Sequence, residues 1–265
     1  MSEKLTVSQS LLNKYLEYKE GNECGEFIKL AMIDRLVDMK KTDPMRMGER
    51  FEYEAVGNMD YNGNIPEAFM LKNGAPSAKQ YTIASQVLNF KTWFNTNGYE
   101  VLAHGERIDI DFPNFVLSGM IDLVFKDTEG MIYLCDLKLT GNIGNTESPW
   151  GWYPEAITEH LNKRNQMMIY LLLGQLSEKY KTNKFVFYVA SSKDQNEFVP
   201  YEVTVSDETL EKEKERIFAL AEEISFEYEI GLTPRPSGSR CAKCTAKDIC
   251  TKKDENKSGN LQITF

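Results

Sequence analysis

Several common signatures of function are missing from this chain of 265 residues. It has no Gly-x-x-x-x-Gly-Lys-Ser/Thr phosphate-binding loop, so nothing indicates an ATP-driven motor. The chain has only 2 histidines, His104 and His160, which argues against a zinc hydrolase site built from histidine. No apolar run approaches the roughly 18 residues that a membrane helix needs, and the first residues show no basic segment followed by an apolar one. We therefore expect a soluble, unsecreted protein with no membrane contact.

Basic charge and cysteine are also scarce. The 31 Lys and Arg residues are outnumbered by 40 Asp and Glu residues, which gives a formal net charge of −9. Any contact with nucleic acid must therefore use a local basic surface or metal ions. The 5 cysteines are too few and too clustered for a secreted disulfide scaffold, and an intracellular cysteine cluster more often binds metal. These features predict a protein of the reducing cytoplasm.

The hydrophobic content and the residue patterns of the chain suit a folded α/β protein. The chain is 42% hydrophobic and 11% aromatic, enough to bury a sizeable core, and its length is near the upper limit for one domain. Strand patterns occur at 99–111, 118–140, 184–190 and 198–205, and helical patterns at 8–18, 26–39, 42–58, 78–96, 154–176 and 207–228. We predict a mixed central β-sheet flanked by helices, in a single domain that covers residues 1–265.

The stretch 118–140 has the composition of a hairpin, and Asp122, Asp136 and Lys138 are its candidate site residues. A three-residue turn at 128–130, with glycine at the position of positive φ, would place Asp122 directly opposite Asp136. Like charges that face each other on a sheet are destabilising, so we expect a cation between them. Because strand side chains alternate, Lys138 shares the face of Asp136. Oxygen ligands suit Mg²⁺ or Mn²⁺, and a lysine beside the ion can orient or deprotonate a water.

These residues resemble the core of the PD-(D/E)XK nucleases. Asp122 followed by Asp136-Leu137-Lys138 matches their motif, and Gly119-x-x-Asp122 is typical of the RecB-like branch. The resemblance implies a restriction-endonuclease-like core at about 42–205 and a metal-dependent deoxyribonuclease. Asp122, Asp136 and the Leu137 carbonyl would hold Mg²⁺ or Mn²⁺, and Lys138 would position or activate the attacking water.

The resemblance also implies a third carboxylate. RecB-like nucleases have Gly-x-x-x-His ahead of the core, with the histidine as a metal ligand, and here Glu52 takes that place after Gly48. A carboxylate is chemically acceptable as a ligand at this position. Glu49 and Glu54 are competing candidates, and a solvated acidic helix face is the alternative interpretation.

A helix after the lysine strand carries Gln166 and Tyr170, which lie on one face because they are four residues apart. This pair resembles the third RecB-like motif, in which the glutamine helps to hold the lysine strand and the substrate. A polar residue at the border of the buried face is the alternative. Trp150 and Trp152, in the loop before this helix, could stack on unpaired bases or pack into the core.

The cysteines near the C-terminus form a second constellation. Cys241-x2-Cys244-x5-Cys250 supplies three thiolates, whereas iron–sulfur clusters and structural zinc sites usually take four ligands. Cys24 can supply the fourth if the two ends of the chain meet. This set resembles the iron–sulfur staple of the AddAB helicase-nucleases and of the RecB-like CRISPR-associated exonucleases, which implies a 4Fe-4S cluster, with structural Zn²⁺ as the alternative. Cys135 is expected in the core.

The resemblance sets the expected organisation and activity. A clasp at about 8–40 and 206–250 would join the ends of the chain, and 251–265 would be a flexible tail. The implied activity is that of an exonuclease on single-stranded DNA ends, in DNA repair, recombination, phage or CRISPR-related DNA processing, with protein partners in a DNA-processing complex. The alternatives are a catalytically silent DNA-binding or assembly module with the same fold and cluster, and a zinc-stapled scaffold.

Overall fold

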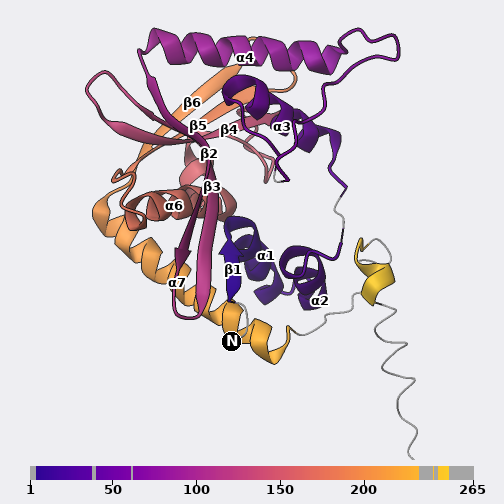
Figure 1. The fold of residues 1–265 in the computed structure, drawn as a ribbon, viewed down its shortest axis with the longest axis vertical. Helices are drawn as coiled ribbons and strands as arrows, with labels where there is room; N and C mark the ends of the chain where they lie inside the picture. Colours follow the sequence, from indigo (N-terminus) through magenta and orange to yellow (C-terminus); the bar gives the residue numbers. More distant parts are fainter. Residues whose placement is uncertain (1–3, 38–39, 61, 233–240, 242–243, 251–265) are drawn as a thin grey trace, which may run out of the picture. The chain divides into compact units, whose positions relative to one another are not determined.

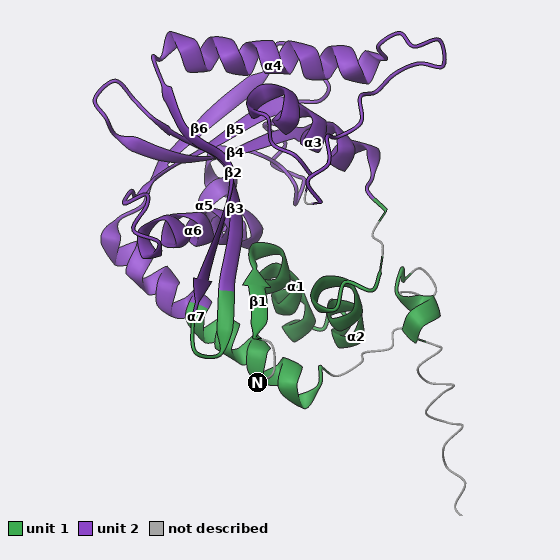
Figure 2. Ribbon diagram, viewed as in Figure 1, with its two compact units in different colours: residues 1–40, 112–116, 218–265 green, residues 41–111, 117–217 purple. Residues whose placement is uncertain are grey.

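The computed structural model describes residues 4–37, 40–60, 62–232, 241 and 244–250 (Figure 1). The chain divides into two compact units, distinguished by colour in Figure 2. Unit 1 comprises residues 1–40, 112–116 and 218–265, and unit 2 comprises residues 41–111 and 117–217. Unit 1 therefore gathers both ends of the chain, and unit 2 holds most of the sequence between them.

Unit 2 is built around a mixed β-sheet. Its strands are β2 (Glu100–Asp111), β3 (Phe115–Lys126), β4 (Ile132–Thr140), β5 (Lys184–Ser191) and β6 (Phe198–Thr204), and its helices are α3 (Asp43–Val56), α4 (Ala78–Thr96), α5 (Pro154–Glu159), α6 (Leu161–Leu176) and the start of α7 (Asp207–Ile230). β4 pairs antiparallel with β3 and parallel with β5, while β6 pairs antiparallel with β5 and β2 pairs with β3. The parallel pair needs a crossover connection, which α5 and α6 supply.

The two faces of this sheet contact different helices. Cys135 and Leu137 of β4 lie in a buried cluster with residues of α3 and α4. Phe185 of β5 contacts Tyr170 of α6, with ring centroids 6.1 Å apart. α4 and α6 lie on opposite sides of the sheet in Figure 1. Because strand side chains alternate, Asp136 points away from α4 and toward α6. The predicted mixed sheet flanked by helices is confirmed.

The predicted hairpin is also confirmed. β3 and β4 pair antiparallel from Lys126 opposite Ile132 to Leu123 opposite Cys135, which is the register predicted for a turn at 128–130. Gly130 closes the turn with φ at 83°. A residue with a side chain would be strained at this positive φ, so the turn favours glycine at position 130. The helices predicted at 42–58, 78–96 and 207–228 are present as α3, α4 and α7, and α4 begins and ends at the predicted residues.

Two helices differ from the prediction. The helix expected at 154–176 is broken at His160, whose extended backbone (φ −75°, ψ 114°) separates α5 from α6. The His160 ring contacts Tyr153 Oη at 3.1 Å and Lys163 Nζ at 3.0 Å, and these contacts stabilise the break. In unit 1, the helix expected at 26–39 ends at Ile33.

Unit 1 contains β1 (Leu5–Ser8), α1 (Gln9–Lys19), α2 (Gly25–Phe27) and the π-helix η1 (Ile28–Ile33). The Ser8 side chain accepts a hydrogen bond from Leu11 N and caps α1. The chain leaves η1 through Arg35 at a φ of 51°, a left-handed conformation that a helix cannot continue through. Leu36 beyond it is 56% exposed, so it does not continue the buried apolar face of η1. Residues 38 and 39 of the predicted helix lie outside the described residues.

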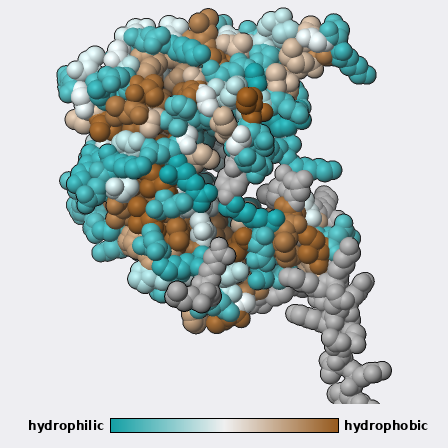
Figure 3. Space-filling view, viewed as in Figure 1, coloured by the Kyte–Doolittle hydropathy of each residue, from teal (hydrophilic) through white to brown (hydrophobic). Residues whose placement is uncertain are grey.

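The helices of the described residues are not membrane spans, because none is both long and apolar enough to cross a bilayer. The surface viewed in Figure 3 is largely hydrophilic, with hydrophobic residues in separate patches. The expected tail at 251–265 lies outside the described residues.

Candidate active site

Asp136 lies at the centre of the predicted site and is fully buried. Its Oδ1 accepts hydrogen bonds from Lys138 Nζ at 2.8 Å and from Gln166 Nε2 at 2.6 Å. Its Oδ2 is 2.7 Å from Lys138 Nζ but accepts no hydrogen bond of acceptable geometry. A buried carboxylate oxygen without a hydrogen bond is rare in folded proteins and is often explained by an ion. This oxygen therefore suits a cation ligand.

Asp122 on β3 is held close to Asp136 by the sheet. The Leu137 amide donates to Asp122 Oδ2 at 2.8 Å, so Leu137 contacts the acidic pair through its main chain. Burial raises the pKa of Asp122 well above its usual range, and the negative charges of Glu52 and Asp136 raise it further. Burial also raises the pKa of Asp136, which the Lys138 ammonium opposes. The acidic pair is thus electrostatically unfavourable in the absence of a cation, as the hairpin pattern predicted.

Glu52 on α3 belongs to the same acidic group. Burial raises the pKa of Glu52 to about 7, with Lys138 opposing the shift and Asp136 adding to it. The other two candidate glutamates have different partners: Glu49 pairs with Lys41 at 2.7 Å, and Glu54 pairs with Arg50 at 2.6 Å. The structure therefore brings Glu52, and not its two competitors, into close electrostatic contact with the aspartates.

Lys138 and Tyr170 complete the group. Burial alone would lower the pKa of Lys138, but Asp136, Asp122 and Glu52 outweigh it and the net shift is upward, so the side chain stays an ammonium ion. Burial and the aspartates raise the pKa of Tyr170, so its phenol stays protonated. Gln166 Nε2 lies 3.4 Å from Tyr170 Oη. All five predicted catalytic side chains are thus close together on one face of the sheet.

The raised pKa of Glu52 leads to a prediction about stability. A folded-state pKa of about 7, above the ordinary 4.5, means that the folded protein favours the neutral carboxyl group, so stability is lost as the pH rises from 4.5 to 7. Glutamine cannot ionise. In EDTA at pH 8, Glu52→Gln should therefore raise the free energy of unfolding by roughly 2–3 kcal/mol. Glu52 is partly exposed, which favours the lower end. Urea denaturation measures the change.

The matched control is Glu49→Gln on the same helix. Glu49 forms a partly exposed pair with Lys41, so its substitution should change the free energy of unfolding by less than about 1 kcal/mol. The gain in Glu52→Gln should disappear at pH 4, where the wild-type carboxyl group is also neutral. Equal stabilities of the two variants at pH 8 would contradict the buried position of Glu52.

The carboxylate oxygens of the acidic group suit a hard divalent ion, although the side chains are not arranged as a complete metal site. Among the described residues, no group of three or more His, Cys, Asp or Glu side chains is placed to hold a metal ion. The acidic group nevertheless offers carboxylate oxygens from Glu52, Asp122 and Asp136, and one of these oxygens lacks a hydrogen bond. Oxygen donors of this kind suit Mg²⁺ or Mn²⁺.

The two tryptophans in the loop after β4 differ in their exposure to solvent. Trp152 is 8% exposed, and its carbonyl accepts a hydrogen bond from Tyr201 Oη at 3.0 Å. Trp150, in contrast, is 66% exposed. Of the two interpretations of these residues, core packing describes Trp152, and Trp150 is left available for contact with a ligand.

Two further residues of unit 2 differ in their relation to the site. Glu106 pairs with Lys179 at 2.6 Å and accepts a hydrogen bond from Tyr180 Oη, so its carboxylate is held outside the acidic group. Asn58 was missed: it is buried and donates from Nδ2 to the Asp122 carbonyl at 2.9 Å. Its only sequence signal is the preceding Gly57, which marks the end of α3.

The cysteines of the predicted staple all fall in unit 1. Cys244 N donates to the Cys241 carbonyl at 3.3 Å, which places these two cysteines on one turn, and Cys250 N donates to the Ala246 carbonyl at 3.0 Å. Cys24 precedes α2 as its N-cap residue. Cys135 is fully buried in the core of unit 2, as predicted.

Comparison with known proteins gives a family and a fold. The chain is similar to the crystal structure of a "Putative exonuclease" from Eubacterium rectale, with a TM-score of 0.56 and 14% identity over 81% of this chain and 80% of that one. The structure described as SSO0001 has a TM-score of 0.41 and 14% identity over 96% of this chain and 89% of that one, too weak to support an argument. No curated protein matches. The sequence model of the PD-(D/E)XK nuclease superfamily matches residues 32–251.

Proposed function

Because the chain belongs to the PD-(D/E)XK nuclease superfamily, we propose that it is a metal-dependent nuclease that hydrolyses DNA phosphodiester bonds at the acidic group of unit 2. One observation carries this proposal. The buried Asp136 carboxylate accepts hydrogen bonds from Lys138 and Gln166 and lies close enough to Asp122 to raise its pKa, so acid, cation and amide converge on one face of the sheet. A silent module would have no need for this electrostatically unfavourable group.

Glu52, Asp122, Asp136 and the Leu137 carbonyl would hold one or two Mg²⁺ or Mn²⁺ ions. Such ions lower the pKa of a bound water and neutralise charge on the phosphate. The need for a cation follows from the side chains themselves, because three carboxylates face a single ammonium group in a buried setting. The proposed metal dependence rests on this imbalance of charge.

The protein's own side chains would orient the reactants. Lys138, as an ammonium ion beside Asp136, would position the attacking water and offset the negative charge that develops on the phosphate. Gln166 fixes the rotation of the Asp136 carboxylate through its 2.6 Å hydrogen bond. Tyr170, kept as a neutral phenol, would donate a hydrogen bond to a phosphate oxygen.

The test is incubation of the purified protein with end-labelled single-stranded and double-stranded DNA in Mn²⁺, Mg²⁺ or EDTA. The proposal predicts cleavage in either ion and none in EDTA. Mononucleotide products from the first time points would indicate an exonuclease, and internal fragments an endonuclease. DNA binding without cleavage in both ions would refute the nuclease and favour the silent module.

We further propose that the substrate is a single-stranded end and that the enzyme acts as a RecB-like exonuclease in cytoplasmic DNA processing. The resemblance to the RecB-like branch supports this mode, as does the name of the Eubacterium rectale protein of similar fold. Trp150 supplies a further argument. It is 66% exposed in the loop between the Asp136 strand and the Gln166 helix, where an unpaired base could stack on it.

Trp150→Ala should therefore weaken binding of single-stranded DNA by about tenfold while changing cleavage of a fully paired duplex little, because base stacking on an aromatic ring contributes roughly 1–3 kcal/mol. Tyr81→Ala is the matched control, since Tyr81 is 58% exposed on α4. Binding is measured by fluorescence anisotropy of a labelled oligonucleotide in EDTA. Unchanged affinity of Trp150→Ala for single-stranded DNA would show that this tryptophan does not contribute to DNA binding.

Cys24, Cys241, Cys244 and Cys250 would hold a 4Fe-4S cluster that fastens the two ends of the chain. Four thiolates match the usual ligand number of such clusters. All four cysteines belong to unit 1, although Cys24 is separated from the other three by most of the sequence. Structural Zn²⁺ on the same thiolates is the alternative, and metal analysis distinguishes the two.

A further inference from the structure

Asn58 is only 6% exposed and contacts the main chain of Asp122 in the proposed site. It follows Gly57, which ends α3 at a φ of 88°, a left-handed conformation that turns the chain sharply after the helix. From there Asn58 Nδ2 donates to the Asp122 carbonyl at 2.9 Å. Leu137 N donates to the carboxylate of the same residue at 2.8 Å. Asp122 is therefore held at both its main chain and its side chain.

His104 on β2 fixes the orientation of the Asn58 amide. His104 Nδ1 lies 3.2 Å from Asn58 Oδ1. Because Nδ2 of Asn58 is the donor to Asp122, Oδ1 must be the acceptor, so Nδ1 of His104 carries the proton in this contact. Both the neutral Nδ1–H tautomer and the imidazolium ion satisfy this requirement. The contact thus determines which way the amide points without depending on the charge of the histidine.

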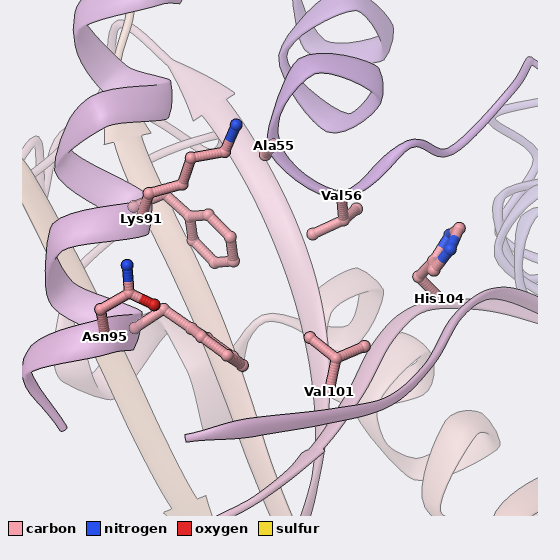
Figure 4. Close-up of a pocket in the computed structure, with 8 residues that line it drawn as sticks. Ala55, Val56, Lys91, Asn95, Val101 and His104 are labelled. Carbon is pink, nitrogen blue, oxygen red and sulfur yellow. The ribbon is translucent and has the colours of Figure 1, made fainter. Parts of the chain in front are cut away.

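Gly105 leaves the space that this arrangement needs. Its φ is 55°, and a Cβ atom built there would lie 2.8 Å from Asn58 Oδ1. The close approach of β2 to Asn58 therefore requires a residue without a side chain. His104 also lines a cavity of about 270 Å³ together with residues of α3 and α4, among them Asn95 (Figure 4).

We propose that Asn58 is a positioning residue that, oriented by His104, fixes Asp122 for metal binding. This inference rests on the proposed function. Groups that orient a metal ligand typically change metal affinity or activity by about 10–100-fold when they are removed. A residue that served packing alone would alter the stability of the fold and leave the affinity for the metal unchanged.

The experiment is a calorimetric titration of the DNA-free, full-length protein with Mn²⁺, together with thermal melting in EDTA. Asn58→Ala should weaken Mn²⁺ binding by about tenfold or more. His104→Phe should give part of this loss, and the double variant should bind no more weakly than Asn58→Ala alone, because the two side chains act as a unit. His104→Asn keeps an N–H donor at the δ position and should restore the affinity. Asn95→Ala, which lines the same cavity, is the matched control.

Unchanged Mn²⁺ affinity in Asn58→Ala would overturn the positioning role, even if its melting temperature fell. Fully additive losses in the double variant would overturn the coupling of Asn58 to His104. Failure of the wild-type protein to bind Mn²⁺ would overturn the proposed metal site and this role with it. This third outcome can be told apart from the first two, because in those outcomes the wild-type protein still binds Mn²⁺.

Discussion

Asp136→Asn and Lys138→Ala should each lower DNA cleavage by about a thousandfold or more, because the ion and the ammonium group stabilise transition-state charge by several kcal/mol. Their effects on stability in EDTA should have opposite signs. Asp136→Asn removes one of the repelling carboxylates and keeps an oxygen for Gln166, so its melting temperature should be unchanged or higher. Lys138→Ala removes the positive charge among three carboxylates, so its melting temperature should fall.

Single-turnover cleavage of end-labelled DNA in saturating Mn²⁺ measures the rates, and thermal melting measures the stabilities. Asp109→Asn is a suitable control, since this exposed aspartate on β2 bonds Arg107 and Ser118 instead of the acidic group. Retention of Mn²⁺-dependent cleavage by both site variants would refute the assignment of the site. A shared decrease in melting temperature would contradict the proposed repulsion between the carboxylates.

Cys24→Ser and Cys250→Ser should both abolish metal binding in unit 1 and destabilise the protein by the same amount. The proposed cluster joins cysteines from opposite ends of the sequence, so its loss opens a loop that spans most of the chain. Loop-closure entropy alone gives a loss of about 5 kcal/mol for a cross-link of this span. Protein purified without oxygen should be brown and contain iron and acid-labile sulfide. Elemental analysis and urea denaturation are the measurements.

The control for this experiment is Cys135→Ser, which changes a cysteine buried in the core of unit 2 and should leave the metal content of the protein unchanged. Four-thiolate zinc without iron in anaerobic protein would exclude the iron–sulfur cluster while keeping a staple. Full metal occupancy in Cys24→Ser would show that the two ends are not joined through this residue.

The parts of the structure that the sequence predicted best depend on neighbouring residues. The hairpin register follows from the positive φ of Gly130 and from the alternation of strand side chains, and both are local properties. The same alternation correctly placed Cys135 in the core and Asp136 on the opposite face. The start of α4 is also fixed locally, by the side chain of Ser77, which caps the helix by accepting a hydrogen bond from Gln80 N.

The parts that the sequence could not resolve depend on distant residues. Glu49, Glu52 and Glu54 have the same chemistry on one helix, and only the packing of α3 beside β4 distinguishes Glu52 from the others. Asn58 lies far along the chain from Asp122, so no spacing rule could connect them. The break at His160 has a local cause, because its ring contacts the nearby Tyr153 and Lys163, but the apolar periodicity of the helix gives no sign of such contacts.

The parallel pairing of β4 with β5 has a consequence for how fast the protein folds. β4 meets β3 across a short turn, but it meets β5 only after the crossover through α5 and α6, as in the pair Asp136 and Phe187. Contacts of such long sequence separation form slowly, since the loop entropy is lost before the contacts are gained. The complete acidic group therefore forms late, and an ion bound there should slow unfolding more than it speeds refolding.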